Sequence, residues 1–310
     1  MKKNPVISVC MITYGHENYI REAIEGVLMQ ECNFEVELII ANDCSPDNTD
    51  LIIQEILQNH PKKSWIKYFR HEKNLRMMPN FIFALGECSG NYVAICEGDD
   101  YWTDPLKLQK QVEFLDANPD FVIHSANAVE LSKDLNNTGK PILKGEIDKV
   151  FTLRDFLSHN NIITCTVMFR NVICEFPESF KEVKFGDWFF YLILMHNTQS
   201  KTYRSTELFS VYRIHEGGVM SNLTKLDYYN THIFQIISIY NYLGNKTLYP
   251  KNDHLLNDFF IKKFRLILKE DMYFESLKTF VTNFKYCGFK MPFKKYLSAL
   301  KYNYLQKGHE

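Results

Sequence analysis

The sequence predicts an α/β protein in which a mostly parallel central sheet is flanked by helices and is followed by a helical C-terminal extension. Strand-like and helix-like segments alternate through the first part of the chain, up to about residue 130. This alternation is typical of parallel sheets. From about Leu226 the pattern becomes helical and amphipathic. We therefore expect an α/β domain over residues 1–224 and a helical extension over residues 225–310.

The first two strands are predicted from continuous apolar runs, which are typical of strands buried on both faces. These runs extend from Val6 to Ile12 and from Val36 to Ala41. Between them, an apolar stripe from Tyr19 to Leu28 has the spacing of an amphipathic helix. After the second strand, Ser45-Pro46 is a helix-start signal, since a capping residue is followed by proline.

The alternation then continues through four further segments. They are a strand from Trp65 to Phe69, a helix around 81–85, a strand from Tyr92 to Cys96 and a helix from Thr103 to about Ala117. Later strand-like segments occupy 121–131, 162–170 and 202–214, and an aromatic helix is predicted near 187–195.

Composition narrows the class of protein. The chain has 310 residues, of which 45% are hydrophobic and 24% are charged, which is ordinary for a globular protein. The formal net charge is −1, and the first 224 residues are the acidic part, so a nucleic-acid partner is not expected. None of the eight cysteines belongs to a CxxC pair, which argues against a zinc ribbon or a thioredoxin-like site.

The N-terminal residues lead directly into a strand without the apolar segment of a signal peptide. No apolar run approaches the ~20 residues that span a membrane. Several cysteines lie inside apolar runs, as expected of buried thiols in a reducing compartment. We therefore expect a cytoplasmic location, with peripheral contact at the inner face of the membrane as an open alternative.

Polar residues follow three predicted strands at the points where the strands end. They are Thr13-Tyr14-Gly15-His16, Asn42-Asp43-Cys44-Ser45 and Glu97-Gly98-Asp99-Asp100. Ligands of open α/β sheets bind beyond the carboxyl ends of the strands. The three clustered carboxylates repel one another unless a cation or a hydroxyl-rich ligand is present, and Mg²⁺ or Mn²⁺ prefers such oxygen ligands. A solvated turn that caps the next helix is the alternative.

Several of these stretches together resemble the family 2 glycosyltransferases, which have the GT-A fold. The resemblance spans about residues 6–222 and rests on six segments. They are Val9 to Tyr14, Leu38 to Thr49, Asn74 to Asn80, Glu97 to Trp102, Phe185 to Trp188 and Val211 to Glu216. The resemblance implies a GT-A-like fold and inverting transfer of a sugar from a nucleotide sugar, taken to be a UDP-sugar. It further implies Mn²⁺ or Mg²⁺ as cofactor and a carbohydrate or lipid-linked glycan acceptor, in surface polysaccharide or glycan assembly.

The resemblance also implies roles for individual residues. Nucleotide-sugar contacts are expected from Thr13, Tyr14, Asp43, Asn74, Arg76, Asn80, Glu97, Asp99 and Arg213. Asp99 and His215 are the expected metal ligands, and His215 could instead meet the diphosphate. Asp187 is the expected catalytic base, although aspartate also suits the start of a buried helix. Arg213 could neutralise phosphate or brace the acidic cluster.

Three positions depart from the family pattern. Glu97 stands where the first aspartate of the DxD motif is commoner, Asn42 replaces the first of two aspartates after the second strand, and Arg76 occupies a position often held by glycine. These departures concern donor selectivity. They leave the class of enzyme unchanged.

The sequence argues against two other classes of α/β enzyme and leaves one binding function open. A dinucleotide-dependent oxidoreductase needs a GxGxxG turn after a strand, which the sequence lacks. A sugar nucleotidyltransferase would carry a phosphate loop rich in glycine and basic residues after the first strand, which is also missing. A non-catalytic module that binds nucleotide sugars on the same fold remains an alternative.

The C-terminal segment combines lysines with aromatic residues. Residues 276–310 contain seven lysines and one acidic residue, Glu310. Phe293, Tyr296, Leu297, Leu300 and Tyr304 share one helical stripe. We expect this stripe to be covered by the catalytic domain, with the lysines solvated. Contact with a membrane surface or a lipid-linked acceptor is the alternative.

Overall fold

The computed structural model of the protein describes residues 7–132, 139–172, 174–219, 221, 223–244 and 250–307. Val6, the first residue of the first predicted strand, lies outside this part. The chain divides into two compact units. Unit 1 comprises residues 1–156 and 160–221, and unit 2 comprises residues 157–159 and 222–310.

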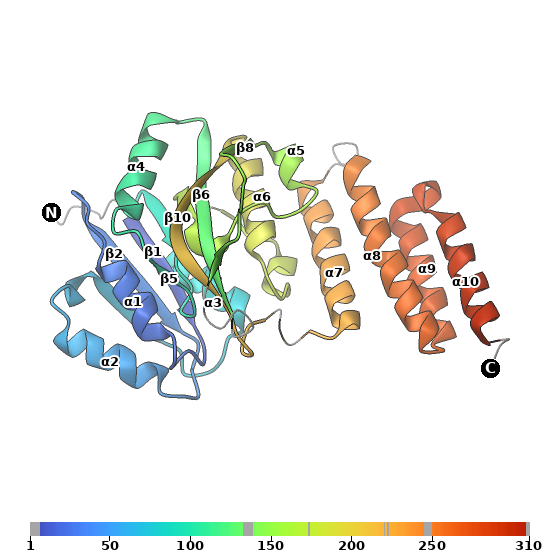
Figure 1. Cartoon of the computed structure of the whole chain (residues 1–310), viewed down its shortest axis with the longest axis horizontal. Helices are drawn as coiled ribbons and strands as arrows, with labels where there is room; N and C mark the ends of the chain where they lie inside the picture. Colours follow the sequence, from blue (N-terminus) through green and yellow to red (C-terminus); the bar gives the residue numbers. More distant parts are fainter. Residues whose placement is uncertain are drawn as a thin grey trace. The chain divides into compact units, whose positions relative to one another are not determined.

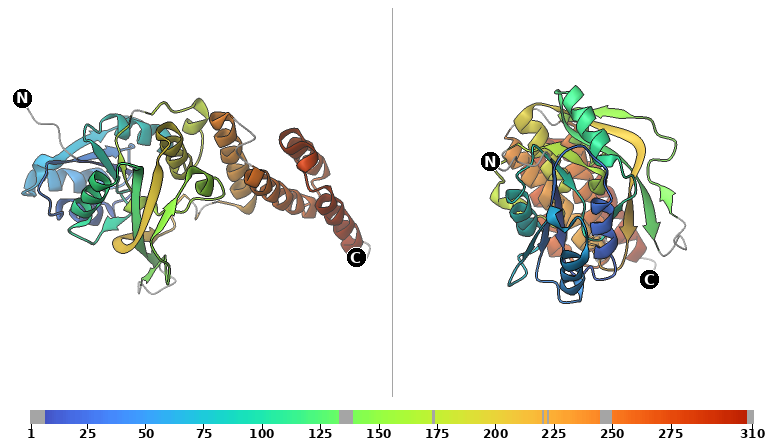
Figure 2. Two further views of the ribbon diagram at one scale, coloured as in Figure 1. Left: turned by 90° about the horizontal axis from the view of Figure 1, so that it is seen from above. Right: turned by 90° about the vertical axis from the view of Figure 1, so that its left-hand side faces the viewer.

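Unit 1 is built on one curled sheet (Figures 1 and 2), whose strands lie in the order β3-β2-β1-β4-β9-β6-β10-β5. These strands are β1 (Ile7–Thr13), β2 (Val36–Asn42), β3 (Ile66–Arg70), β4 (Tyr92–Ile95), β5 (Tyr101–Trp102), β6 (Phe121–Ser132), β9 (Met168–Arg170) and β10 (Lys201–Ile214). Two short strands, β7 (Lys140–Pro141) and β8 (Lys149–Phe151), pair with β6 and β10.

The expected central sheet flanked by helices is confirmed, but only some of its strands pair in parallel. Strands β3, β2, β1 and β4 are parallel, as are β6 and β10. Strand β9 pairs antiparallel with both β4 and β6, so the sheet as a whole is mixed. Only 168–170 of the strand expected over 162–170 forms, because Thr164–Thr166 makes a 3₁₀ turn.

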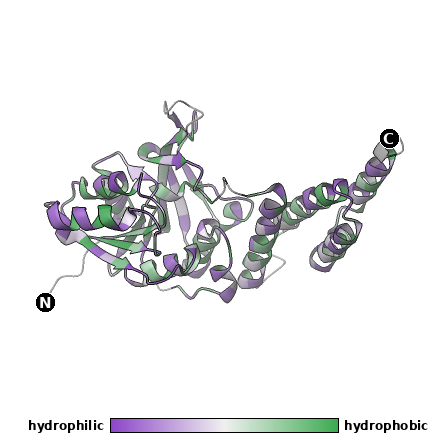
Figure 3. Ribbon diagram, turned by 90° about the horizontal axis from the view of Figure 1, so that it is seen from below, coloured by the Kyte–Doolittle hydropathy of each residue, from purple (hydrophilic) through white to green (hydrophobic). Residues whose placement is uncertain are grey.

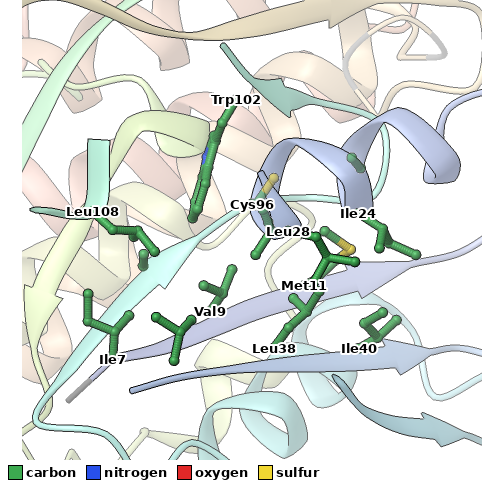
Figure 4. Packing of buried hydrophobic residues seen from close by; sticks show 14 of the residues in the cluster. Ile7, Val9, Met11, Ile24, Leu28, Leu38, Ile40, Cys96, Trp102 and Leu108 are labelled. Atoms are coloured by element: carbon green, nitrogen blue, oxygen red, sulfur yellow. The ribbon is translucent and has the colours of Figure 1, made fainter. Parts of the chain in front are cut away.

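Helices cover both faces of this sheet. One core packs β1, β2 and β4 against α1 (Ile20–Leu28), α2 (Thr49–Asn59) and α4 (Lys107–Ala117) (Figure 4). On the other side, α3 (Met77–Gly86) and α6 (Asp187–Thr198) meet through Phe81 and Phe190, whose ring centroids are 5.4 Å apart. A short helix, α5 (Leu153–Phe156), lies between β8 and α6 in the chain.

The start of α2 differs from the sequence prediction. The helix begins at Thr49, and the Ser45-Pro46 signal lies in the preceding turn. The Thr49 amide donates to Asp47 Oδ1 at 3.1 Å. Asp47 Oδ2 also accepts a bond from the Glu17 amide at 2.9 Å. These bonds hold this turn against the turn that follows β1, so the helix begins later in the chain than predicted.

The described residues of unit 2 form four long helices, which confirms the helical C-terminal extension. They are α7 (Lys225–Leu243), α8 (Pro250–Lys269), α9 (Tyr273–Cys287) and α10 (Phe293–Lys307). The last three meet around Tyr296, whose ring lies 4.7 Å from Phe264 and 5.0 Å from Phe280. Within the described ranges, none of the helices has the length and apolar character needed to cross a bilayer.

Candidate active site

The turns after β1 and β2 form one edge of the site. The two strands pair in register up to Thr13 opposite Asn42, so their carboxyl ends are level. The Asp43 amide donates to the Thr13 carbonyl at 2.9 Å, and the Gly15 amide donates to Ser45 Oγ at 3.0 Å. Gly15 has a φ of 72°, a left-handed conformation that glycine adopts without strain. Tyr14, which lies between Thr13 and Gly15 in this turn, is 49% exposed.

Asp43 is buried beside the segment that precedes α3. Its Oδ1 accepts a hydrogen bond from the Leu75 amide at 2.7 Å. Asn74 Oδ1 accepts from the Arg76 amide at 2.9 Å, which stabilises the bend there. The side chains of Asn74 and Arg76 are exposed. The structure therefore brings four predicted nucleotide-binding residues, Tyr14, Asp43, Asn74 and Arg76, around one edge of the sheet.

Asn80 and Asn42 stabilise this edge through hydrogen bonds of their buried side chains. Asn80 is buried, and its Nδ2 donates to the Ala41 carbonyl at 3.0 Å while its Oδ1 lies 2.8 Å from His71 Nε2. Its amide therefore has protein partners on both atoms. Asn42 Oδ1 accepts from the Ser45 amide and hydroxyl, and its Nδ2 donates to Tyr68. An aspartate could not donate this last bond, which gives a structural reason for the departure at Asn42.

The acidic turn after β4 packs directly against the turn after β1. The Gly98 amide donates to the Ile12 carbonyl at 3.0 Å. A Cβ on Gly98 would lie 2.7 Å from Thr13 Oγ1 and 2.9 Å from His16 Nδ1. Only glycine allows this close approach, and it places Asp99 beside the polar residues that follow β1.

Asp99 lies between two histidines. Its Oδ2 is 3.0 Å from His215 Nε2 and 3.7 Å from His16 Nε2. Burial opposes ionisation of Asp99, but the bond to His215 and the charge of His16 outweigh it and lower its pKa. The structure thus brings the two expected metal ligands, Asp99 and His215, together. His16 was missed as a member of this group, although its place in the turn after β1 was a signal.

Asp99 and His215 are the residues that would hold a divalent cation. Their 3.0 Å separation is that of the hydrogen bond between them. In the part of the chain that the structure describes, no set of three His, Cys, Asp or Glu side chains is arranged to hold a metal. The protein would then supply two ligands, and substrate phosphates and water would supply the others.

The other two acids of this turn have raised pKa values. Burial raises the pKa of Glu97 well above its usual range, and the charges of Asp99, Asp100 and Asp187 raise it further. Burial, followed by the charge of Asp99, does the same to Asp100. Asp100 Oδ1 accepts a hydrogen bond from the Arg213 amide at 2.8 Å. This contact fixes the end of β10 on the acidic turn.

The Arg213 side chain braces the acidic turn. Its Nη1 donates to the Asp99 carbonyl at 2.7 Å, and its Nη2 pairs with Glu22. The guanidinium also lies over the Tyr101 ring, 4.3 Å from its centroid, and near Tyr19. These contacts favour the bracing role over phosphate binding. The sequence did not reveal Glu22 or Tyr19 as its partners, since they lie almost 200 residues away.

Asp187 is the first residue of α6 and is held by two side chains. Its Oδ2 accepts hydrogen bonds from Asn160 Nδ2 at 2.7 Å and Thr164 Oγ1 at 3.1 Å. Burial nevertheless raises its pKa. The charge of Asp187 contributes to the raised pKa of Glu97. Asn160 and Thr164 were not identified from the sequence, since both precede Asp187 in an irregular segment.

Polar and acidic side chains thus gather at the carboxyl ends of β1, β2 and β4. A family model described as "Glycosyl transferase family 2" matches residues 8–176. The chain belongs to this family. The curled mixed sheet with its flanking helices is the GT-A fold.

Particular relatives agree with this assignment. An uncharacterized protein of Mycobacterium tuberculosis is 34% identical over 217 residues, which cover 69% of this chain and 60% of that protein. The UDP-Glc:α-D-GlcNAc-diphosphoundecaprenol β-1,3-glucosyltransferase WfaP of Escherichia coli is 27% identical over 229 residues, covering 71% of this chain and 82% of that protein. The chain thus spans about 60% of the length of the mycobacterial relative.

A solved structure has the same fold. Residues 1–349 of TarS from S. aureus, in complex with UDP-GlcNAc, superpose with a TM-score of 0.59 at 21% sequence identity. The similarity covers 83% of this chain and 72% of the TarS chain. At this identity the comparison shows the shared fold alone.

Proposed function

We propose that the protein transfers a sugar from a nucleotide sugar, most simply a UDP-sugar, to a hydroxyl group of a carbohydrate or lipid-linked glycan. The observation that carries this proposal is that the turns bearing Asp43 and Asp99 are both bonded to the end of β1, with His215 3.0 Å from Asp99. Family membership supports it. The donors in the names of WfaP and of the TarS complex, UDP-Glc and UDP-GlcNAc, support a uridine nucleotide.

The nucleoside would bind at the edge formed by β1 and β2. Tyr14 offers an exposed ring for stacking on the base. Asp43 has one carboxylate oxygen on the Leu75 amide, and its other oxygen can accept a bond from the base. Asn74 and Arg76 border this edge, whereas Thr13 and Asn80 would shape it, since both are buried.

The diphosphate would lie at the acidic turn, together with Mn²⁺ or Mg²⁺ held by Asp99 and His215. A divalent ion there supplies positive charge that stabilises the departing nucleoside diphosphate. Glu97 would meet the donor ribose or sugar through its half-buried carboxyl group. Arg213 keeps Asp99 and Asp100 in place through the bonds described above.

Asp187 would accept the proton of the acceptor hydroxyl as its oxygen attacks the anomeric carbon. Its bonds from Asn160 and Thr164 occupy Oδ2 and fix the direction of the carboxyl group. A direct attack of this kind inverts the anomeric carbon and needs no side-chain nucleophile. A raised pKa suits the role, because a general base works best with a pKa near the operating pH.

The proposed place of action is the cytoplasmic side of a membrane, in the assembly of surface polysaccharide or another glycan. All eight cysteines are free thiols, which supports a reducing compartment. The acceptor in the name of WfaP is a lipid-linked sugar, which supports an acceptor of that class.

The proposal is tested by incubating the full chain with UDP-Glc, UDP-GlcNAc and GDP-Man and measuring the nucleoside diphosphate released, with Mn²⁺ and with a chelator. We expect release from a UDP-sugar that requires the metal and rises when a glycan acceptor is added. A protein that binds UDP tightly yet releases no diphosphate from any of the three donors, with glycan acceptors present, would instead be a non-catalytic module.

A further inference from the structure

Helices α9 and α10 each carry an exposed apolar stripe. On α9 the stripe is Phe274, Leu277, Val281 and Phe284, and on α10 it is Phe293, Leu297, Leu300 and Tyr304. Both sets follow the spacing of one helical face. The opposite faces, which include Ser276, Thr279 and Asn283 on α9 and Tyr296 and Ala299 on α10, are the buried ones.

Within unit 2, most of the stripe that was expected to be covered on α10 is not packed against the neighbouring helices. Of the five residues assigned to it, Tyr296 alone turns inward, where its hydroxyl accepts a bond from Asn283 Nδ2 at 2.8 Å. The helical period showed a shared stripe, but it could not show that Tyr296 lies at the border facing α8 and α9. The remaining four residues are exposed, Leu297 by 65% and Tyr304 by 79%.

The two stripes join at the turn between the helices. Phe289 in this turn is 91% exposed, and its ring centroid lies 5.8 Å from that of Phe284. Phe284 in turn lies 6.1 Å from Phe293. We call the two stripes together with Phe289 the α9–α10 face. Apolar surface of this extent is unusual in a monomeric protein and marks an interaction site.

Lysines accompany this face. Exposed lysines stand at 278, 285, 290, 294, 295 and 301, and the helical period puts Lys295 on the side of α10 away from the stripe. Residues 276–309 contain no acidic residue. Figure 3 shows hydrophilic and hydrophobic residues alternating along these helices. Lys278 pairs with Glu275 at 3.7 Å. Lys307 belongs to the same series, but its side chain lies outside the described part. The face is thus apolar with a strongly basic border.

The charge decides between two partners of this face. A second copy of the chain would bring two lysine borders together, and Glu275 is the one acidic residue of α9 and α10 that could neutralise them. An anionic lipid surface supplies the missing negative charge and an apolar layer for the aromatic rings. Basic residues beside Phe and Leu on one helical face are typical of helices that lie in the membrane interface.

We propose that the α9–α10 face docks the protein on the surface of an anionic phospholipid bilayer, with Phe274, Phe289 and Leu297 among the inserted side chains. The helices lie on the bilayer and do not cross it. This docking does not depend on the proposed sugar transfer, but it would place a transferase beside a lipid-linked acceptor.

The test is cosedimentation of the full chain with phosphatidylcholine vesicles, with and without phosphatidylglycerol. We expect binding that requires phosphatidylglycerol and weakens as salt is raised. Replacing Lys285, Lys294, Lys295 and Lys301 by Gln should weaken binding by at least about 100-fold, since each lysine contributes about fivefold at low salt. The double variant Leu277→Ser/Leu297→Ser should reduce it at all salt concentrations, because the loss is apolar.

Matched controls use exposed positions elsewhere. They are the double variant Leu51→Ser/Ile147→Ser and the replacement of Lys144, Lys184, Lys201 and Lys225 by Gln, and both should bind vesicles like the wild type. The circular dichroism spectrum and the thermal unfolding of each variant, compared with those of the wild type, report an intact fold. This readout does not depend on UDP binding, so the test stays separate from the fate of the proposed function.

Two outcomes would overturn the docking proposal. The first is no binding to phosphatidylglycerol vesicles at low salt, or binding that both test variants retain. The second is that the wild type forms a dimer in analytical ultracentrifugation, and that Leu277→Ser/Leu297→Ser converts it to a monomer while vesicle binding stays unchanged. That result would assign the face to a second copy of the chain.

Discussion

Replacing Asp187 by Asn should separate the binding of the donor from the chemical step. Asparagine has nearly the same shape, and its side-chain oxygen can accept the bonds that Asn160 and Thr164 donate at 2.7 and 3.1 Å. The substitution removes the negative charge from the first turn of α6, which changes stability by about 0.3–1 kcal/mol. It also removes the proposed proton acceptor.

The expected loss of activity is much larger than this effect on stability. A general base contributes roughly 100-fold or more to the rate, which corresponds to about 2.7 kcal/mol in the activation barrier. Turnover of Asp187→Asn should fall by at least this factor. Its affinity for UDP should remain near that of the wild type, because the proposed contacts with the nucleotide and its metal are made by Asp43 and Asp99.

The pH profile provides a second readout. The base acts in its ionised form, so the rate falls as pH falls through its pKa. Because burial raises the pKa of Asp187, the acid limb of kcat/KM should lie above the value of about 3.9 for an ordinary aspartate. The residual activity of Asp187→Asn should lack this limb.

Rates would be measured as nucleoside diphosphate release, and affinities by calorimetry. Asp227→Asn is the matched control, since it removes a first-turn aspartate from α7 and should leave the rate unchanged. Near wild-type turnover of Asp187→Asn would refute the base role. Parallel losses of turnover and UDP affinity would return Asp187 to a purely structural role.

Two further predictions concern stability. Gly98→Ala would place a Cβ 2.7 Å from Thr13 Oγ1 and 2.9 Å from His16 Nδ1. Denaturant unfolding should therefore show that the free energy of unfolding falls by about 1–3 kcal/mol, and UDP binding should weaken. The control Gly86→Ala has no atom within 4 Å of its Cβ and should not lower the stability, so equal effects of the two variants would contradict the packing described. Burial lowers the pKa of Lys107 in the folded protein to about 7, whereas the unfolded chain keeps the higher pKa of an ordinary lysine. From about pH 7 to about pH 9 the unfolded chain therefore binds more protons than the folded protein, and the free energy of unfolding rises with pH. Lys107→Met should remove about 2 kcal/mol of this rise. If the curves of unfolding free energy against pH stay parallel for the wild type and the variant, Lys107 does not titrate in this range.

The sequence predicted the parallel part of the sheet well, for a physical reason. Strands buried on both faces need continuous apolar runs, such as Val9 to Ile12 and Leu38 to Ala41, and these runs are readily recognised. The carboxyl ends of neighbouring parallel strands meet at one edge, so the proximity of Asp43 and Asp99 to this edge followed from their positions after the strands.

Other features depend on contacts that are distant in the chain. The direction of β9 could not be inferred, because an apolar run does not reveal which way its strand pairs. The bonds that Asn160 donates to Asp187, and Arg213 to Glu22, link irregular or remote segments. The exposed stripe on α10 could be recognised as a stripe, but its periodicity carries no information about what covers it.

The metal-assisted nucleotide site is tested most directly by following thermal unfolding with UDP, in Mn²⁺ and in chelator, for the wild type and for Asp99→Asn. We predict that UDP with Mn²⁺ stabilises the wild type by about 2.7 kcal/mol when UDP is a hundredfold above its dissociation constant. The stabilisation should shrink in chelator, and Asp99→Asn should show the small effect under both conditions. Equal stabilisation of the wild type with and without the metal would contradict the site.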